Sequence, residues 1–117
     1  MGYKIIYTIG REFDEEFSMK GYRSDLLLMD SNGNYFELNY VEPEVILNSF
    51  NQSSIYYIEN NLILVHDLSF ETIIASVYEL ERRLFVDNWQ PLTIEQLEKY
   101  YSPREKWEIY EIKNDHE

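Results

Sequence analysis

The hydrophobic and polar positions of residues 55–85 predict two strands followed by a helix. This stretch reads IYYI-ENN-LILVHDL-S-FETIIASVYELERRLF. The aromatic and β-branched run Ile55–Ile58 is typical of a strand, and Leu62–Val65 is continuously apolar, as expected for a central strand covered on both faces. Because Asn adopts positive φ more readily than most residues, Asn60 and Asn61 between these runs predict a hairpin turn.

Apolar residues then recur at helical spacing from Phe70 to Leu84, which predicts one long amphipathic helix. Ser69 is a preferred capping residue, and Leu68 before it can pack on Ile73 as a hydrophobic staple. The hairpin and this helix supply the expected core. Its members are Ile63, Val65, Phe70, Ile73, Ile74, Val77 and Leu84.

The N-terminal part of the chain predicts three more strands. Tyr3–Ile9 is strand-like, and Asp25–Met29 and Tyr35–Val41 flank an Asn-Gly pair, which is a strong hairpin signal. Apolar and largely polar residues alternate in the second arm, so one face of this sheet is expected to be exposed. The polar stretch Arg11–Gly21 fits neither period well, and we interpret it as a loop or an irregular edge strand, with a helix as the less favoured alternative.

The remaining segments predict two short helices and a last strand. Pro43 can begin a helix at Pro43–Asn48, and Thr93 begins the capping box T-I-E-Q of a helix at Ile94–Tyr101. The charged, alternating run Lys106–Ile112 predicts an edge strand. The expected fold class is therefore α+β, with an antiparallel sheet of about five to six strands built from hairpins. One long and one or two short helices are expected on one face of that sheet, in a single domain of residues 1–117.

Net charge adds an expectation about partners. The 22 acidic residues outnumber the 10 basic ones, for a formal charge of −12. This balance argues against binding nucleic acid or an anionic membrane through a broad electrostatic surface. It is compatible with simple solubility and with binding of a basic protein. The chain has no cysteine, no secretory leader and no apolar run long enough to span a bilayer, so we expect a cytoplasmic protein.

No residue pattern indicates catalysis or a cofactor. His66 and Asp67 are adjacent, but no serine, cysteine or threonine accompanies them in a nucleophile motif, and a structural role is favoured. The second histidine, His116, lies far away, which disfavours a zinc site. The four glycines are scattered singly and form no phosphate-binding loop. We therefore expect no catalytic residue, no metal and no cofactor, and do not expect an enzyme.

The candidate residues for partner binding are acidic and aromatic. The run Asp14-Glu15-Glu16 is followed by Phe17, and Trp89 lies in the connection DNWQP, where exposure is expected. Aromatic side chains cover large areas at little entropic cost and commonly anchor interfaces. Glu37, on the expected exposed face of the sheet, is a further candidate. The partner-binding set is thus Asp14, Glu15, Glu16, Phe17, Glu37 and Trp89.

The segments IYYIENNLILVHDLSFETIIASVYEL and FVDNWQPL resemble the immunity proteins of bacterial polymorphic toxin and contact-dependent growth inhibition systems. The resemblance lies in a hairpin N-N-L-I-x-V followed by S/T-x-E-x-I-x-x-A-V, and it covers about a third of the chain. It implies a cytoplasmic domain that binds a toxin domain, often a nuclease, and blocks its active site. It assigns no functional residue, since each immunity protein binds its own toxin through its own surface.

Two further hypotheses belong to other functional classes. One is a non-catalytic structural or regulatory interaction module, which could form a homodimer through an edge strand. The other, less favoured, is an enzyme. Tight, salt-sensitive binding to one basic protein would favour the inhibitor, and a concentration-dependent dimer without a partner would favour the module.

Overall fold

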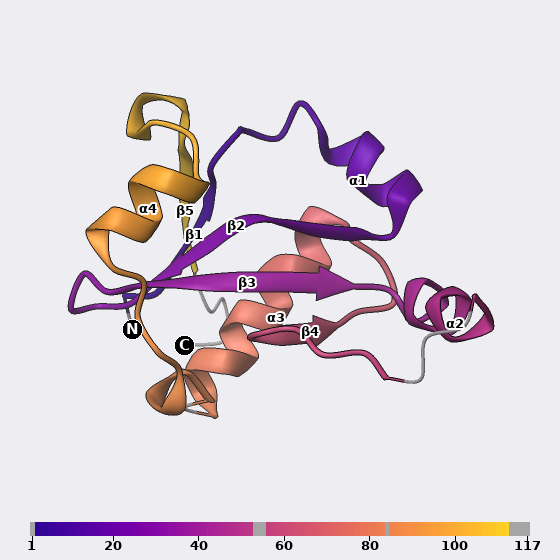
Figure 1. Ribbon diagram of the computed structural model, residues 1–117. Coiled ribbons are helices and arrows are strands. Elements are labelled where there is room, and N and C mark those ends of the chain that lie inside the picture. The colour runs from indigo at the N-terminus through magenta and orange to yellow at the C-terminus, as the bar shows by residue number, and fades with distance from the viewer. Residues whose placement is uncertain (1, 53–55, 84, 113–117) are drawn as a thin grey trace.

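The computed structural model in Figure 1 describes residues 2–52, 56–83 and 85–112. It shows an α+β fold with a five-stranded sheet in the order β4-β3-β2-β1-β5. The strands are β1 (Lys4–Tyr7), β2 (Tyr22–Met29), β3 (Tyr35–Val41), β4 (Leu62–Leu64) and β5 (Glu108–Glu111). The helices are α1 (Asp14–Lys20), α2 (Pro43–Asn51), α3 (Phe70–Arg82) and α4 (Ile94–Tyr100), with short 3₁₀ turns η1 (Phe85–Asn88) and η2 (Arg104–Lys106).

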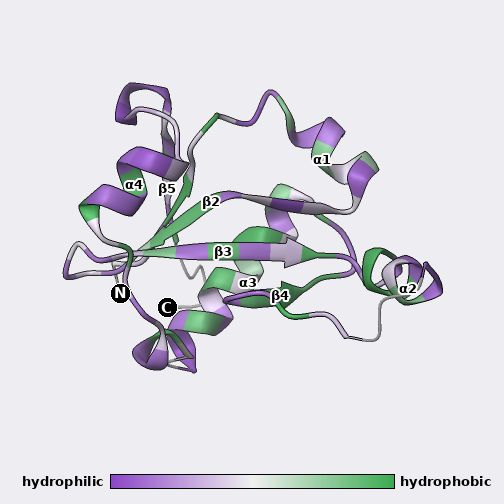
Figure 2. Ribbon diagram, viewed as in Figure 1, coloured by the Kyte–Doolittle hydropathy of each residue, from purple (hydrophilic) through white to green (hydrophobic). Residues whose placement is uncertain are grey.

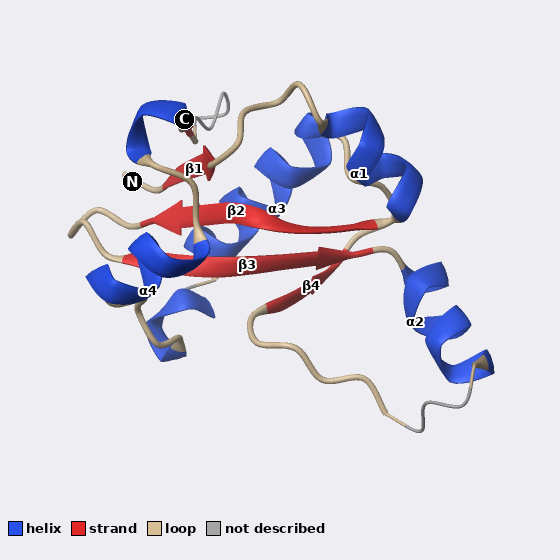
Figure 3. Ribbon diagram, turned by 45° about the horizontal axis from the view of Figure 1, so that its top comes forward, coloured by secondary structure: helices blue, strands red, loops and turns tan. Residues whose placement is uncertain are grey.

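The sheet is covered on both faces, whereas the sequence predicted helices on one face only. Helix α3 packs on one face of the sheet and α4 lies over the other, as Figures 1 and 3 both show. Alternate residues of β1 and β2 therefore belong to two different hydrophobic clusters, one on each face of the sheet. The main core contains Ile5 and Leu28 together with Ile73 of α3, and the smaller core contains Ile6, Leu27 and Leu97 of α4.

The predicted central hairpin at residues 55–65 is wrong. Residues 56–59 form no strand, Ile55 lies outside the described residues, and β4 pairs with β3 in parallel at the edge of the sheet. Two asparagine side chains fix this pairing. Asn61 Nδ2 donates to the Glu37 carbonyl (2.9 Å) and Asn39 Nδ2 donates to the Asn60 carbonyl (2.6 Å). Asn61 has the expected positive φ, +49°, but it leads into a parallel edge rather than a hairpin.

The hairpin of β2 and β3 is confirmed, and β2 begins three residues earlier than predicted. Asp30 Oδ1 accepts from the backbone N–H groups of Asn32 and Asn34, and Gly33 takes the positive φ (+81°) that the turn requires. The face expected to be exposed is partly covered, because α4 lies over it. Glu37 is half-buried and Asn39 is buried.

The segment Arg11–Gly21, interpreted as a loop or edge strand, contains helix α1. None of its seven residues is buried, so apolar periodicity could not reveal it. A helix this short is not stable by propensity alone. Gly21 ends it in the left-handed conformation (φ +80°), where its N–H donates to the Phe17 carbonyl (2.9 Å).

The helix signals of the C-terminal half are confirmed. Ser69 caps α3, with its Oγ accepting from the Thr72 N–H (3.2 Å), and Thr93 and Gln96 form the predicted capping box of α4. Strand β5 lies at the sheet edge, as expected. Of the expected core, Val65, Ile73 and Val77 are buried, and Leu84 lies outside the described residues. The remaining members, Ile63, Phe70 and Ile74, are half-buried against the main core.

Candidate functional site

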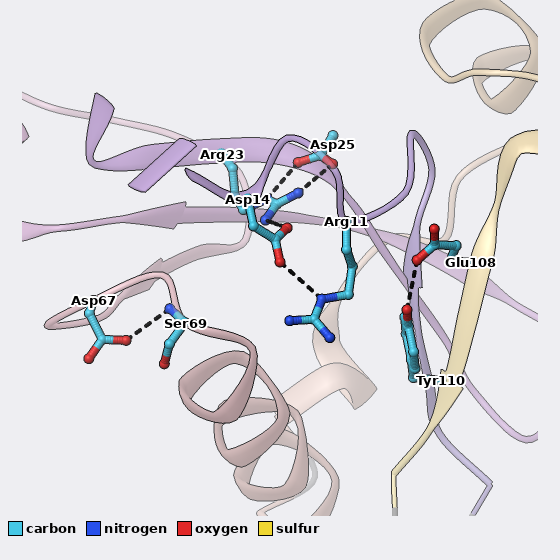
Figure 4. Close-up of polar contacts among 8 residues, drawn as sticks. All are labelled: Arg11, Asp14, Arg23, Asp25, Asp67, Ser69, Glu108 and Tyr110. Carbon is cyan, nitrogen blue, oxygen red and sulfur yellow. Dashed lines mark hydrogen bonds and ion pairs between the residues drawn. The ribbon is translucent and has the colours of Figure 1, made fainter. Parts of the chain in front are cut away.

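A buried guanidinium organises the side of the sheet next to α1. The Arg23 side chain has no exposed surface, and its Nε and Nη2 donate to both carboxylate oxygens of Asp25 at 2.8 and 2.9 Å. Its Nη1 donates to Asp14 (2.9 Å), which also accepts from Arg11 (Figure 4). Burial alone would lower the Arg23 pKa, but the hydrogen bonds and charges of Asp25 and Asp14 outweigh it and raise that pKa.

Aromatic rings complete this cluster and attach α1 to the sheet. The Arg23 guanidinium carbon lies 4.3 Å from the ring centre of Phe17 and 4.9 Å from that of Tyr7. Asp14 and Phe17 are therefore used within the fold, the first as an ion-pair partner and the second as a ring stacked on a cation. Of the predicted acidic run, Glu15 and Glu16 remain exposed. Arg23 and Asp25, which our sequence interpretation missed, carry no local pattern that marks them as buried.

Asp67 has a structural role at the start of α3. His66 is largely exposed, and its Nε2 lies 2.8 Å from Asp67. Hydrogen bonds from Ser69 and Thr72 at the start of α3 lower the pKa of Asp67 to about 2. A carboxylate held in this way stabilises a helix N-terminus. No serine, cysteine or threonine nucleophile is hydrogen-bonded to His66 in the described part of the chain.

Exposed apolar side chains gather at one end of the molecule, which we call the acidic–apolar end. It comprises α1, α2, residues 56–60, Tyr22 and Leu64, and Figures 1 and 3 place α1 and α2 together beyond the ends of β2 and β3. Among the described residues, ten large apolar side chains are exposed and seven of them lie here. These are Met19 (88%), Ile58 (81%), Tyr56, Leu47, Leu64, Tyr22 and Phe50.

Backbone contacts join the parts of the acidic–apolar end. The Glu42 N–H, just before α2, donates to the Gly21 carbonyl at the end of α1 (2.8 Å). Tyr22 pairs with Val41, which in turn pairs with Leu64, so these three residues lie in one row across the sheet. In Figure 2, α2 carries both hydrophobic and hydrophilic colour, and most of α1 is hydrophilic. An apolar centre with a polar surround is the usual composition of a protein interface.

The same end is strongly acidic. The residues that make up this end include one basic residue, Lys20, whose Nζ lies 5.9 Å from the Phe17 ring centre. Their acidic members are Asp14, Glu15, Glu16, Glu44 and Glu59. Of these, Asp14 is neutralised by Arg11 and Arg23. The field of this end therefore favours a positively charged surface.

Trp89 and Glu37, which the sequence analysis also proposed for partner binding, are not part of the acidic–apolar end. Trp89, expected to be exposed, is half-buried against the main core, with its ring centre 6.4 Å from that of Phe36. Glu37 lines a cavity of about 350 Å³ between the sheet and α4, together with Ser24, Asn39, Leu92, Gln96, Tyr100 and Tyr101. A neighbouring cavity of about 290 Å³ is lined by Tyr101 and Trp107 at the other side of α4.

Among the described residues, no group of three or more His, Asp or Glu side chains is arranged to hold a metal ion. None of the helices in the described ranges has the length and apolar character needed to cross a membrane. No family model matches this chain, and no curated protein or solved structure shows significant similarity to it.

Proposed function

We propose that this protein is an immunity-type inhibitor that binds a basic toxin domain through the acidic–apolar end. The observation that carries the proposal is the coincidence, at one end of the fold, of seven exposed apolar side chains with an excess of carboxylates. Exposed apolar patches of this kind mark protein interfaces. Nucleases hold phosphate backbones in basic clefts, which an acidic surface complements and approaches rapidly.

The functional test first seeks a toxin domain among the products of neighbouring genes, and then expresses that domain in a host with and without this protein. We expect the full chain to restore growth and to bind the purified domain tightly. Leu64→Asp should weaken binding by roughly 30-fold or more, about 2 kcal/mol, because it places a charge within the apolar centre of the contact.

Ile109→Asp is the matched control, since Ile109 is similarly exposed (52%) on the opposite edge strand β5. This variant should bind as the natural protein does. Equal weakening by both substitutions, or by neither, would contradict the assignment of the acidic–apolar end.

One observation favours self-association as a second candidate. Within the described residues β4 pairs only with β3, and Leu64 of β4 is exposed. An open strand edge can pair with a second copy. However, two such acidic ends would repel each other. Sedimentation equilibrium at low and high salt distinguishes the inhibitor from the self-associating module. A dimer that forms without a partner and persists on dilution would favour self-association.

A further inference from the structure

The Glu37 cavity adjoins the acidic–apolar end, since Asn39 in its lining donates to the Asn60 carbonyl, and its floor is shaped by an irregularity in the sheet. The pairing of β2 with β3 shifts between Arg23 and Leu26, so two residues of β2, Ser24 and Asp25, are opposite one residue of β3, Asn39. Bulges of this kind redirect side chains and recur beside functional sites. Here Arg23 and Asp25 form the buried ion pair, and Ser24 joins Glu37 and Asn39 in the cavity.

The Glu37 carboxylate has no partner among the residues that the structure describes. Among the described residues, no hydrogen bond or ion pair reaches its side chain, although its backbone carbonyl accepts from Asn61. The side chain is nevertheless half-buried, and no Lys or Arg of the described chain lines the cavity. A partly desolvated carboxylate without a counter-ion is a favourable place for a cation.

The walls of the cavity also suit a cation. Tyr100 and Tyr101 of the α4 region contribute aromatic rings and hydroxyl groups, and Gln96 contributes a side-chain amide whose Oε1 already accepts from the Thr93 N–H in the capping box. Burial, followed by the charges of Glu37 and Asp25, raises the pKa of Tyr101 to about 12, so its hydroxyl stays protonated at neutral pH. The Tyr100 ring centre lies 5.3 Å from Lys99 Nζ, which shows that this ring tolerates a cation beside it.

We infer that this cavity binds a guanidinium group, the arginine side chain of a protein partner. A guanidinium can donate two parallel hydrogen bonds to Glu37 and place its planar face against a tyrosine ring, whereas an ammonium is a compact, strongly hydrated charge. The volume of about 350 Å³ is at the small end of ligand cavities, about 300–1,000 Å³, and suits one side chain. A divalent metal is disfavoured, because one carboxylate is too few for Ca²⁺.

The test uses the isolated chain of 117 residues without any partner, so its outcome does not depend on the proposed inhibitor function. N-acetyl-arginine-N-methylamide is titrated while the resonances of the Gln96 side-chain amide and the Tyr101 ring are followed by NMR. We expect saturable shifts at these groups with a dissociation constant on the order of 1 mM, as for a single side chain. The citrulline analogue, which has a neutral urea in place of the guanidinium, should produce no saturable shift.

Two variants complete the experiment. Glu37→Gln should raise the dissociation constant about tenfold or more, as expected for loss of a charge-assisted hydrogen-bonded pair. The control is Glu98→Gln, which removes one negative charge from an exposed position of α4 that lines the neighbouring cavity. This variant should change the dissociation constant less than twofold. Equal shifts with citrulline, equal effects of the two variants, or shifts spread over all surface carboxylates would overturn the inference.

Discussion

Replacement of Arg23 by alanine should lower the free energy of unfolding by about 3–5 kcal/mol, because it leaves Asp25 as a largely buried charge without its partner and leaves Asp14 with Arg11 alone. The Arg23 side chain is fully buried, and the exposed fractions of the Asp14 and Asp25 side chains are only 25% and 11%. The two rings that stack on the guanidinium, Tyr7 and Phe17, would also border an empty space. Urea unfolding of the natural and variant proteins measures this loss.

The matched control is Arg82→Ala on α3. Arg82 also makes two hydrogen bonds to one carboxylate, that of Glu79, at 2.9 and 3.1 Å, but both side chains are about half exposed. Exposed pairs contribute about 0–1 kcal/mol, so this variant should unfold nearly as the natural protein does. If Arg23→Ala were as mild as Arg82→Ala, the buried cluster would not hold α1 on the sheet. If Arg23→Ala abolishes folding, Arg23→Met tests the same cluster with most of the volume retained.

A second large effect is expected in the main core. Ile73→Ala should cost about 2–5 kcal/mol of unfolding free energy, since Ile73 is fully buried between α3 and the sheet and its loss leaves a cavity. Ile74→Ala makes the same chemical change one residue later, where the side chain is half-buried, and should cost less. Thermal and urea unfolding of both variants gives the comparison. An equal or larger cost at Ile74 would contradict the orientation of α3.

Helices α3 and α4 could be predicted from the sequence, whereas the pairing of β4 could not. The spacing of apolar residues and the Ser69 and Thr93 caps located α3 and α4, because both signals are local. The pairing of β4 was not predictable in this way. A short apolar run is equally compatible with a central and an edge strand. The pairing of β4 with β3 is stabilised by side-chain hydrogen bonds of Asn39 and Asn61, and the spacing of apolar residues gives no information about such bonds.

Only the acidic character of the candidate site was predicted from the sequence. The acidic run of α1 was identified from sequence, but one of its three carboxylates, Asp14, is bound to a cation 9 residues away, Arg23. The apolar part of the acidic–apolar end was missed, because Met19, Leu47 and Ile58 are ordinary apolar residues until the fold leaves them exposed. Glu37 was chosen for an exposed sheet face, and the structure places it in a cavity that α4 creates.

The most direct test of the proposed inhibitor function is the salt dependence of association with a cognate toxin domain, sought first among the products of neighbouring genes. The Debye length falls from roughly 30 to 3 Å between about 0.01 and 1 M salt, so electrostatic attraction should be progressively screened. The variants are Glu15→Gln, Glu16→Gln and Glu44→Gln combined, at the acidic–apolar end. The control combines Glu95→Gln, Glu98→Gln and Glu105→Gln, three exposed positions of α4 and η2.

We predict that the association rate of the natural protein falls steeply with salt, and that the first triple variant associates more slowly with a flatter salt dependence. The control, which carries the same net charge as the first variant, should stay close to the natural protein. An association rate unchanged across this salt range, or equal slowing by the two triple variants, would contradict recognition through the acidic–apolar end.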